Sequence, residues 1–204
     1  MVSGGVENGK AFLALEHLAL RRDGDYAALA RMLAALHRTT GPRYGWHRDN
    51  YIGLTPQANG WCDDWSVFWR ERRLRPQLEL AGKNGFAFKS FPFEDLLKGH
   101  HPQPALLHGD LWSGNAGFTA KGPVLFDPAV YYGDRETDLA MTELFGGFPP
   151  EFYAAYDAAF PLEPGYEKRK PLYNLYHLLN HLNLFGGGYL AQVEAALSLL
   201  RHAL

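Results

Sequence analysis

The segment from Ala105 to Asp127 constrains the fold of this chain more than any other part of its sequence. It opens with an apolar run at 105–107 and continues as His108-Gly109-Asp110-Leu111-Trp112-Ser113-Gly114-Asn115. Two runs of strand-forming residues follow at 115–118 and 123–126, with turn-forming residues between them. We therefore expect a β-hairpin that returns the chain so that Asp127 lies beside Asn115.

Three polar side chains in this segment are the kind that phosphoryl transfer from ATP requires. One carboxylate must orient the attacking hydroxyl and accept its proton, and oxygen ligands must hold magnesium. Asp110 and Asn115 keep the D-x-x-x-x-N spacing of kinase catalytic loops, and Asp127 matches the later metal-binding aspartate. The pattern predicts Asp110 as the catalytic base and Asn115 and Asp127 as ligands of Mg²⁺. His108 is expected to fix the shape of the loop by hydrogen bonds.

Two other interpretations of these residues remain open at this point. The carboxylates could be ordinary loop residues beside a hairpin, because D-x-x-x-x-N also occurs by chance. They could also form a carboxylate metal site of the hydrolytic type.

The rest of the sequence is mainly helical in pattern. The Asn8-Gly9 pair predicts a turn between strands at 2–6 and 12–16. Residues 41–62 show no periodicity and are expected to form a long ordered loop. The fold class is therefore α+β, mostly helical. Apolar periodicity and capping residues predict helices at 25–40, 93–98, 135–145, 149–160, 165–185 and 188–203. A further helix is predicted to begin at residue 64 and to be kinked or restarted at Pro76.

Charge and composition exclude several classes of protein. The 204 residues have a formal charge of −2, which gives no broad basic surface for nucleic acid or an anionic membrane. No run of 18 apolar residues occurs, so we expect no membrane span. The single cysteine, Cys62, rules out an intrachain disulfide framework and favours a reducing, cytoplasmic location.

The sequence resembles the fructosamine/ketosamine-3-kinase family, in the aminoglycoside-phosphotransferase-like branch of the protein-kinase-like fold. The resemblance covers residues 5 to 200 and implies ATP and Mg²⁺ as cofactors, transfer of a phosphoryl group to a sugar hydroxyl, and a ketosamine (sugar–amine adduct) as substrate. The motifs that carry it are the 108–115 segment, Phe126-Asp127-Pro128-Ala129, Tyr132-Gly133-Asp134-Arg135-Glu136 with Asp138 and the residues up to Phe148, Asn50-Tyr51-Ile52-Gly53 with Thr55-Pro56-Gln57, Arg73-Leu74-Arg75-Pro76-Gln77-Leu78 and Leu175-Tyr176-His177-Leu178-Leu179-Asn180-His181.

The start of the chain departs from the family pattern. Residues 12–18 resemble the last strand of the small lobe and the linker between lobes, so only about ten residues precede that strand. We divide the chain into a hairpin and linker at 1–20 and a helical large lobe at 21–204. The resemblance implies that the backbone of Glu16 and Leu18 contacts adenine. Without the glycine-rich loop and the strand lysine, turnover is expected to be far slower than in an extended form.

Several further expectations follow from single residues. Trp112 and His177 are candidates for substrate contact. His177 and His181 have i, i+4 spacing that could bind zinc, but hydrogen-bonded core histidines are favoured. Asp138 is expected to cap a helix or brace the loop. Trp61, Trp65, Phe68 and Trp69 are expected in the core, and Arg70, Arg72, Arg73 and Arg75 on a solvated helix face.

Two functional alternatives and one expectation about assembly follow from the same features. The chain could be a non-catalytic remnant of a kinase that binds a sugar or a protein. It could also be an aminoglycoside or choline-type kinase that shares the His-Gly-Asp loop. The hairpin would have an open edge and a bare apolar face, so a homodimer through residues 2–20 is expected.

Overall fold

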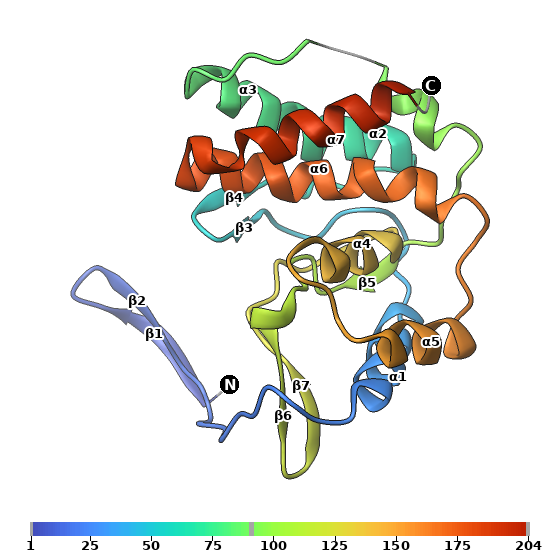
Figure 1. The fold of residues 1–204 in the computed structure, drawn as a ribbon. Helices are drawn as coiled ribbons and strands as arrows, with labels where there is room; N and C mark the ends of the chain where they lie inside the picture. Colours follow the sequence, from blue (N-terminus) through green and yellow to red (C-terminus); the bar gives the residue numbers. More distant parts are fainter. Residues whose placement is uncertain (1, 90–91, 203–204) are drawn as a thin grey trace.

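Two groups of helices flank a central β region in the computed structural model, which describes residues 2–89 and 92–202 (Figure 1). One group contains α2, α3, α6 and α7 together with α4, which packs against α6, and the other contains α1 and α5, which pack against each other. The helices are α1 (Tyr26–His37), α2 (Trp65–Trp69), α3 (Arg75–Lys83), α4 (Glu136–Leu144), α5 (Pro150–Ala159), α6 (Tyr166–Phe185) and α7 (Leu190–His202). Short helical segments are η1 (Arg70–Leu74), η2 (Phe93–Leu97), η3 (Ser113–Asn115) and η4 (Gly187–Tyr189).

The helices begin where the capping residues predict. The side chain of Asp25 accepts a hydrogen bond from Ala28 N, and that of Asp64 accepts one from Val67 N. After Trp69 the backbone passes through a π-helical turn, η1, before α3 begins one residue ahead of Pro76. The predicted restart at this proline is confirmed, because Pro76 occupies the first turn, where its missing N–H costs nothing. The predicted end of the last helix at residue 203 lies outside the described residues.

Within the part of the chain that the structure describes, the strands form four antiparallel pairs. The hairpin predicted after the polar loop is confirmed as β6 (Ala116–Thr119) with β7 (Gly122–Leu125). The short apolar run is β5 (Ala105–Leu107), which pairs with β8 (Tyr131–Gly133), a strand that the sequence did not indicate. Residues 41–62 are not simply a loop, because they contain a small hairpin of β3 (Asn50–Ile52) and β4 (Thr55–Gln57).

The expectation that Arg73 lies on a solvated helix face is wrong. Its side chain is fully buried, and its guanidinium carbon lies 4.0 Å from the ring centre of Tyr131 and 4.7 Å from that of Phe68. It donates to the carbonyl of Ala58 and to the side chain of Asn59. A local run of arginines cannot reveal this, because the π-helical turn η1 rotates Arg73 toward the aromatic core. Trp65, Phe68 and Trp69 lie in that core as predicted, whereas Trp61 is 37% exposed.

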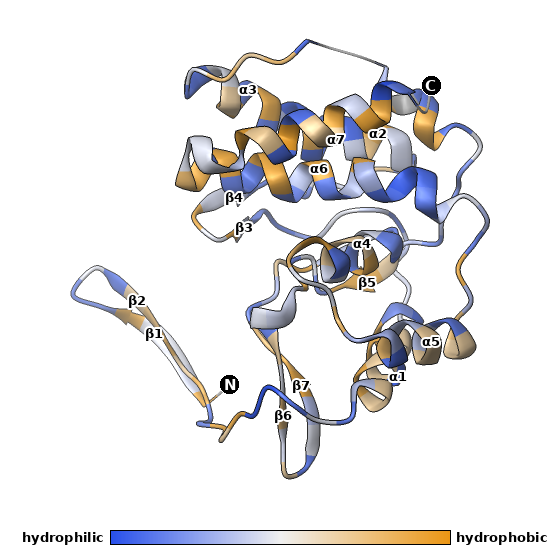
Figure 2. Cartoon of the chain, in the orientation of Figure 1, coloured by the Kyte–Doolittle hydropathy of each residue, from blue (hydrophilic) through white to orange (hydrophobic). Residues whose placement is uncertain are grey.

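The N-terminal hairpin projects from the helical body. It consists of β1 (Ser3–Glu7) and β2 (Lys10–Ala14), joined at Asn8-Gly9 as predicted. Every residue of β1 is exposed, and β2 exposes Phe12 and Leu13. Figure 2 shows apolar residues along this isolated hairpin, away from the packed helices. Within the described residues, no helix has both the length and the apolar character needed to cross a membrane.

Candidate active site

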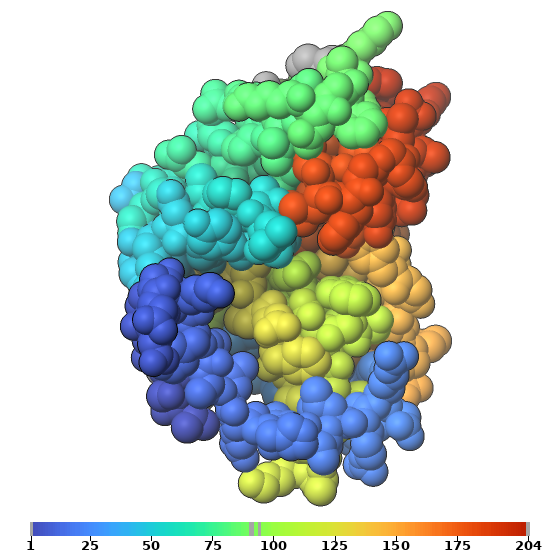
Figure 3. Space-filling view, turned by 90° about the vertical axis from the view of Figure 1, so that its left-hand side faces the viewer, coloured from blue at the N-terminus to red at the C-terminus, as the bar shows by residue number. Residues whose placement is uncertain are grey.

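The loop from His108 to Asn115 connects β5 to the β6–β7 hairpin. In Figure 3 the central part of the chain, coloured yellow-green, lies in a hollow between the N-terminal hairpin and the C-terminal helices. The loop is therefore reached from the side on which the hairpin projects. Three side chains fix its conformation: one comes from α4, and two are the first and last residues of the loop itself.

The first of these side chains is Asp138 of α4, which binds the start of the loop. Its Oδ2 accepts a hydrogen bond from His108 N at 2.7 Å and its Oδ1 accepts one from Gly109 N at 2.8 Å. The Nε2 atom of His37 in α1 lies 3.1 Å from Oδ2. Burial alone would raise the pKa of Asp138, but the hydrogen bond from His37, the nearby imidazoles and the Gly109 N–H together lower it. The predicted bracing role of Asp138 is confirmed.

The second is His108, whose imidazole joins the start of the loop to the end of the β6–β7 hairpin. Its Nε2 lies 2.9 Å from the carbonyl of Phe126, and its Nδ1 accepts a hydrogen bond from Asp110 N at 3.3 Å. Gly109 has a φ of 82°, and an added Cβ atom would lie 2.1 Å from the carbonyl oxygen of Ala129. Only glycine fits this close approach with a positive φ, so the geometry explains the glycine of the His-Gly-Asp sequence.

The third is Asn115, which holds Asp110. Its Nδ2 donates to the backbone oxygen of Asp110 at 2.8 Å and lies 3.4 Å from the carboxylate Oδ2. Burial, followed by the charge of Asp138, raises the pKa of Asp110 to about 6, and the charge of Asp127 acts in the same direction. The hydrogen bond from Asn115 opposes this shift.

Asp127 is placed beside this pair by the β6–β7 hairpin. Phe126 N donates to the carbonyl of Asn115 at 3.1 Å, so the residue before Asp127 is fixed to Asn115. Asp127 is exposed and has a φ of 54°, a conformation that costs energy for a residue with a side chain. The structure thus brings Asp110 and Asn115 into contact and places Asp127 close enough for its charge to act on Asp110.

A cavity of about 440 Å³ lies beside the loop. Leu20, Arg21 and Arg22 line it together with Trp112 and Phe126. Trp112 is 39% exposed, and its ring lies so close to Gly114 that a Cβ atom there would clash with it. Two backbone hydrogen bonds between Arg21 and Phe118, of 2.8 and 2.9 Å, fix the segment after the hairpin to β6.

The remaining predicted site residues lie farther from the loop or are enclosed. Glu16 and Leu18 are exposed in the irregular segment between β2 and this cavity. His177 is only 3% exposed, and burial lowers its pKa to about 3, so its imidazole is neutral. Its Nδ1 has no hydrogen-bond partner among the described residues, which corrects the expectation of a hydrogen-bonded histidine. The Nδ1 of His181 lies 2.8 Å from the carbonyl of His177 instead.

Sequence reasoning did not find the residues that support the loop from outside. His37 contacts Asp138 across 101 positions, and Gln57 donates to the carbonyl of Ala129 at 3.0 Å. Tyr176 in α6 donates to Gln57 Oε1 at 2.8 Å. Gln57 and Tyr176 both lie in segments that carry the family resemblance, and this was the only signal available for them.

The arrangement is that of the large lobe of a protein-kinase-like fold. A crystal structure of a choline/ethanolamine kinase family protein from Mesorhizobium loti superposes with a TM-score of 0.51 at 14% identity, covering 89% of this chain and 63% of that one. A structure described as a fructosamine-3-kinase from Haemophilus somnus gives a TM-score of 0.89 at 34% identity, covering 99% and 71%. The fold class expected from the sequence is confirmed.

Sequence comparison gives the family. The fructosamine kinase family model matches residues 1–202. A protein named as a ketoamine kinase in Synechocystis is 51% identical over 203 residues, which are 95% of this chain and 68% of the relative. The ketoamine kinase YniA of Escherichia coli K12 is 41% identical, covering 96% and 71%. The chain belongs to the fructosamine kinase family, a family of phosphotransferases, and spans 68% to 71% of the length of these two relatives.

The raised pKa of Asp110 predicts a dependence of stability on pH. Because the folded-state value of about 6 lies above the ordinary 3.8, the folded chain binds this proton more tightly, and stability falls as pH rises between these values. Asp110→Asn should therefore raise the free energy of unfolding at pH 8 by roughly 1–3 kcal/mol, since one pKa unit corresponds to about 1.4 kcal/mol. Near pH 4 the gain should be small.

Urea unfolding at the two pH values, in buffer free of divalent cations, measures this difference. Asp157→Asn, at an exposed position in α5, is the matched control and should show no such gain. An Asp110→Asn variant that is no more stable than the unmodified chain at pH 8 would contradict the environment described for this carboxylate.

Proposed function

We propose that this protein transfers the γ-phosphoryl group of ATP to a hydroxyl of a ketosamine. The observation that carries the proposal is the contact between Asp110 and Asn115 in a loop fixed by Asp138. Phosphoryl transfer depends mainly on positioning, and this loop has little freedom to move. The sugar–amine substrate is proposed because the relatives are named as ketoamine kinases.

Asp110 is the proposed catalytic base. Its carboxylate is partly buried, and Asn115 Nδ2 lies 3.4 Å from its Oδ2. The other oxygen, Oδ1, can therefore face the attacking hydroxyl. A pKa of about 6 leaves it mostly ionised at neutral pH while making it a stronger proton acceptor than an ordinary aspartate.

Asn115 and Asp127 are the residues that would hold Mg²⁺. Asn115 uses Nδ2 to bind Asp110, which leaves its side-chain oxygen for a metal, and Asp127 supplies a carboxylate. Oxygen donors of this kind suit Mg²⁺, and the negative charge that Asp127 and Asp138 impose on Asp110 favours a cation nearby. The ion would neutralise charge on the phosphates, while the side chains keep the acceptor and the nucleotide in place.

The nucleotide is proposed to lie along the segment from Glu16 to Arg21. The backbone of Glu16 and Leu18 would contact adenine, and the cavity that begins at Leu20 would receive the remainder of the nucleotide. This placement agrees with the hydrogen bonds that fix Arg21 to β6, because a rigid wall beside Asn115 would hold the phosphates near the loop.

Trp112 and His177 are the proposed substrate contacts. The exposed face of the Trp112 indole can stack on a sugar, while Gly114 supports its other face. His177 has a neutral imidazole with an unpartnered Nδ1, and a substrate hydroxyl would satisfy this nitrogen. The free thiol of Cys62 fits a cytoplasmic location for the reaction.

Two substitutions separate the proposed roles. Asp110→Asn should leave Mg²⁺-dependent binding of ATP close to that of the unmodified chain but reduce phosphorylation of N-fructosyl lysine about 10²–10⁴-fold, because it removes the proton acceptor. Asp127→Ala should abolish the Mg²⁺-dependent part of ATP binding. Calorimetry measures binding, and ³¹P NMR measures product.

Turnover is measured on this chain and, with the corresponding substitution, on the longer Escherichia coli relative. We propose that the 204 residues alone phosphorylate N-fructosyl lysine much more slowly than that relative does, because this loop would contact the phosphates of ATP only through the bound Mg²⁺. Unchanged turnover in the Asp110→Asn variants would exclude this aspartate as the base.

A second role, self-association through residues 2–20, is supported by the exposed hairpin. The two outer edges of the β1–β2 sheet pair with no other described strand, and Val6, Phe12 and Leu13 are 74%, 49% and 61% exposed. A second copy of the chain can satisfy both features by antiparallel pairing of the hairpins.

Sedimentation tests this role with two matched variants. Leu13→Lys, on the hairpin, should shift the chain toward monomer, whereas Leu199→Lys, at a position of similar exposure on α7, should not. A strict monomer at high concentration, or a dimer lost only with Leu199→Lys, would refute self-association through the hairpin.

A further inference from the structure

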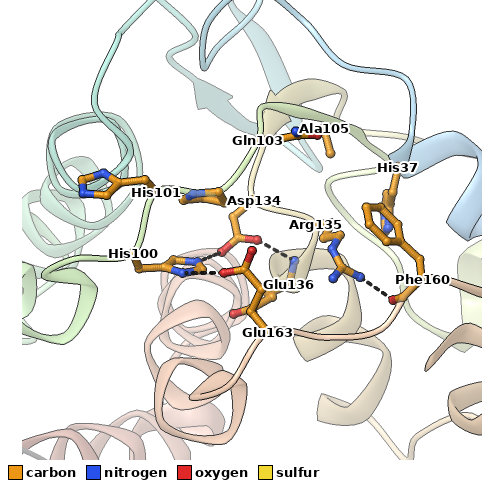
Figure 4. A pocket seen from close by; sticks show the side chains of 11 residues that line it. His37, His100, His101, Gln103, Ala105, Asp134, Arg135, Glu136, Phe160 and Glu163 are labelled. Atoms are coloured by element: carbon orange, nitrogen blue, oxygen red, sulfur yellow. Dashed lines mark hydrogen bonds and ion pairs between the residues drawn. The ribbon is translucent and has the colours of Figure 1, made fainter. Parts of the chain in front are cut away.

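A second cavity, of about 380 Å³, lies at the opposite end of the β5–β8 pair from the His108–Asn115 loop. Ala105 and Gly133 are paired at this end, and Asp134 follows directly after the strand. His100, Asp134 and Glu136 all line this cavity, and Figure 4 shows the imidazole of His100 beside the carboxylates of Asp134 and Glu163. The proposed phosphoryl-transfer reaction uses none of these side chains.

The three side chains place metal-binding atoms close together. One ligand atom from each of His100, Asp134 and Glu136 lies within 4.8 Å of the other two. The side chains of His100 and Asp134 are only 7% and 2% exposed, and Glu136 is buried beside them. Bonds of about 2.0–2.2 Å to a single ion require ligand atoms within roughly 4 Å of each other, so a small closure of the three side chains would be enough.

Each of the three donors also has an outer partner that orients it. Asp134 Oδ2 lies 2.7 Å from His100 Nε2. On the opposite side of the imidazole ring, Glu163 Oε2 lies 3.7 Å from His100 Nδ1. Tyr173 donates to Asp134 Oδ2 at 2.6 Å, and Arg169 contacts both oxygens of Glu136. A carboxylate behind a histidine, and hydrogen bonds to ligating carboxylates, are the usual outer shell of a metal site.

The charges around the cavity also favour a cation. Asp134, Glu136 and Glu163 line it, and the only guanidinium among the lining residues is that of Arg135. Figure 4 shows Arg135 turned toward Phe160, and its guanidinium donates to the backbone carbonyls of Phe160 and Pro161 rather than to Asp134 or Glu136. The cavity therefore offers carboxylates and imidazoles to whatever enters it.

We propose that His100, Asp134 and Glu136 form a binding site for a divalent transition metal ion, with Zn²⁺ as the best-suited occupant. One imidazole nitrogen with two carboxylates suits Zn²⁺ better than Mg²⁺, which prefers oxygen ligands alone. The ion binds the Nε2 lone pair, so the proton between Nε2 and Asp134 moves to Nδ1 beside Glu163 or leaves to solvent. Arg169 keeps one oxygen of Glu136, and the other binds the ion.

Occupation of this site would link three parts of the chain. His100 belongs to the connection between η2 and β5, Asp134 follows β8, and Glu136 begins α4. Asp138 is only two residues beyond Glu136 on the same helix and binds the His108–Asn115 loop. A bound ion would therefore stabilise the helix that holds the loop.

Calorimetry and thermal unfolding with ZnCl₂ test the proposal on the chain after treatment with a chelator. The expected result is binding of one Zn²⁺ per chain and a higher melting temperature, with no comparable effect of MgCl₂. His100→Gln should remove both effects, while His101→Gln, which lines the same cavity outside the three donors, should keep them. Absence of binding, or equal binding by the His100→Gln variant, would overturn the proposal.

X-ray absorption at the zinc edge gives a test that does not depend on the folding of a variant. The spectrum of the loaded chain should show one imidazole with oxygen ligands. A spectrum with sulfur, or with two or more imidazoles, would place the ion elsewhere and overturn the assignment.

Discussion

The carboxylate of Asp138 is the contact on which the geometry of this site depends. It accepts the N–H groups of His108 and Gly109 at 2.7 and 2.8 Å, so the two residues before Asp110 have one position relative to α4. An ionised carboxylate at an almost fully buried position is costly unless every oxygen is satisfied. His37 and the two backbone donors meet that need and lower the pKa of Asp138 against the effect of burial.

Side-chain contacts on two sides of the site connect the position of the loop to the rest of the lobe. His37 also lies 2.7 Å from the hydroxyl of Tyr156, which joins α1 to α5 behind the loop. On the other side, Arg73 is stacked against Tyr131 in β8 and donates to the carbonyl of Ala58. A buried guanidinium is stable here because aromatic faces and carbonyl oxygens replace its water. These supports anchor the buried ends of the loop in the core while Trp112 to Gly114 stay exposed, which suits a reaction that depends on positioning.

Local signals in the sequence predicted much of this structure, and long-range contacts account for what was missed. The caps at Asp25 and Asp64, the Asn8-Gly9 turn and the β6–β7 hairpin depend on neighbouring residues and could be predicted. Strand β8 is only three residues long, too short to show a periodic pattern in the sequence, and it is defined by its pairing with β5. The burial of Arg73 depends on a π-helical turn, and the His37–Asp138 contact joins residues 101 positions apart. Neither has a local signature. Residue spacing in the 108–127 segment predicted Asp110, Asn115 and Asp127 as site residues, and Asp138 was expected to brace the loop. The supporting contacts of His37, Gln57 and Tyr176 were not predicted.

Amide hydrogen exchange at His108 and Gly109 tests most directly whether Asp138 fixes the loop. In the unmodified chain these two amides should exchange slowly, because they donate to a buried carboxylate. Asp138→Asn leaves only one accepting oxygen and should accelerate exchange at one or both amides, while Glu143→Gln, in the same helix but partly exposed, should leave them unchanged. Equal exchange rates at His108 and Gly109 in the unmodified chain and in a folded Asp138→Asn variant would contradict the account.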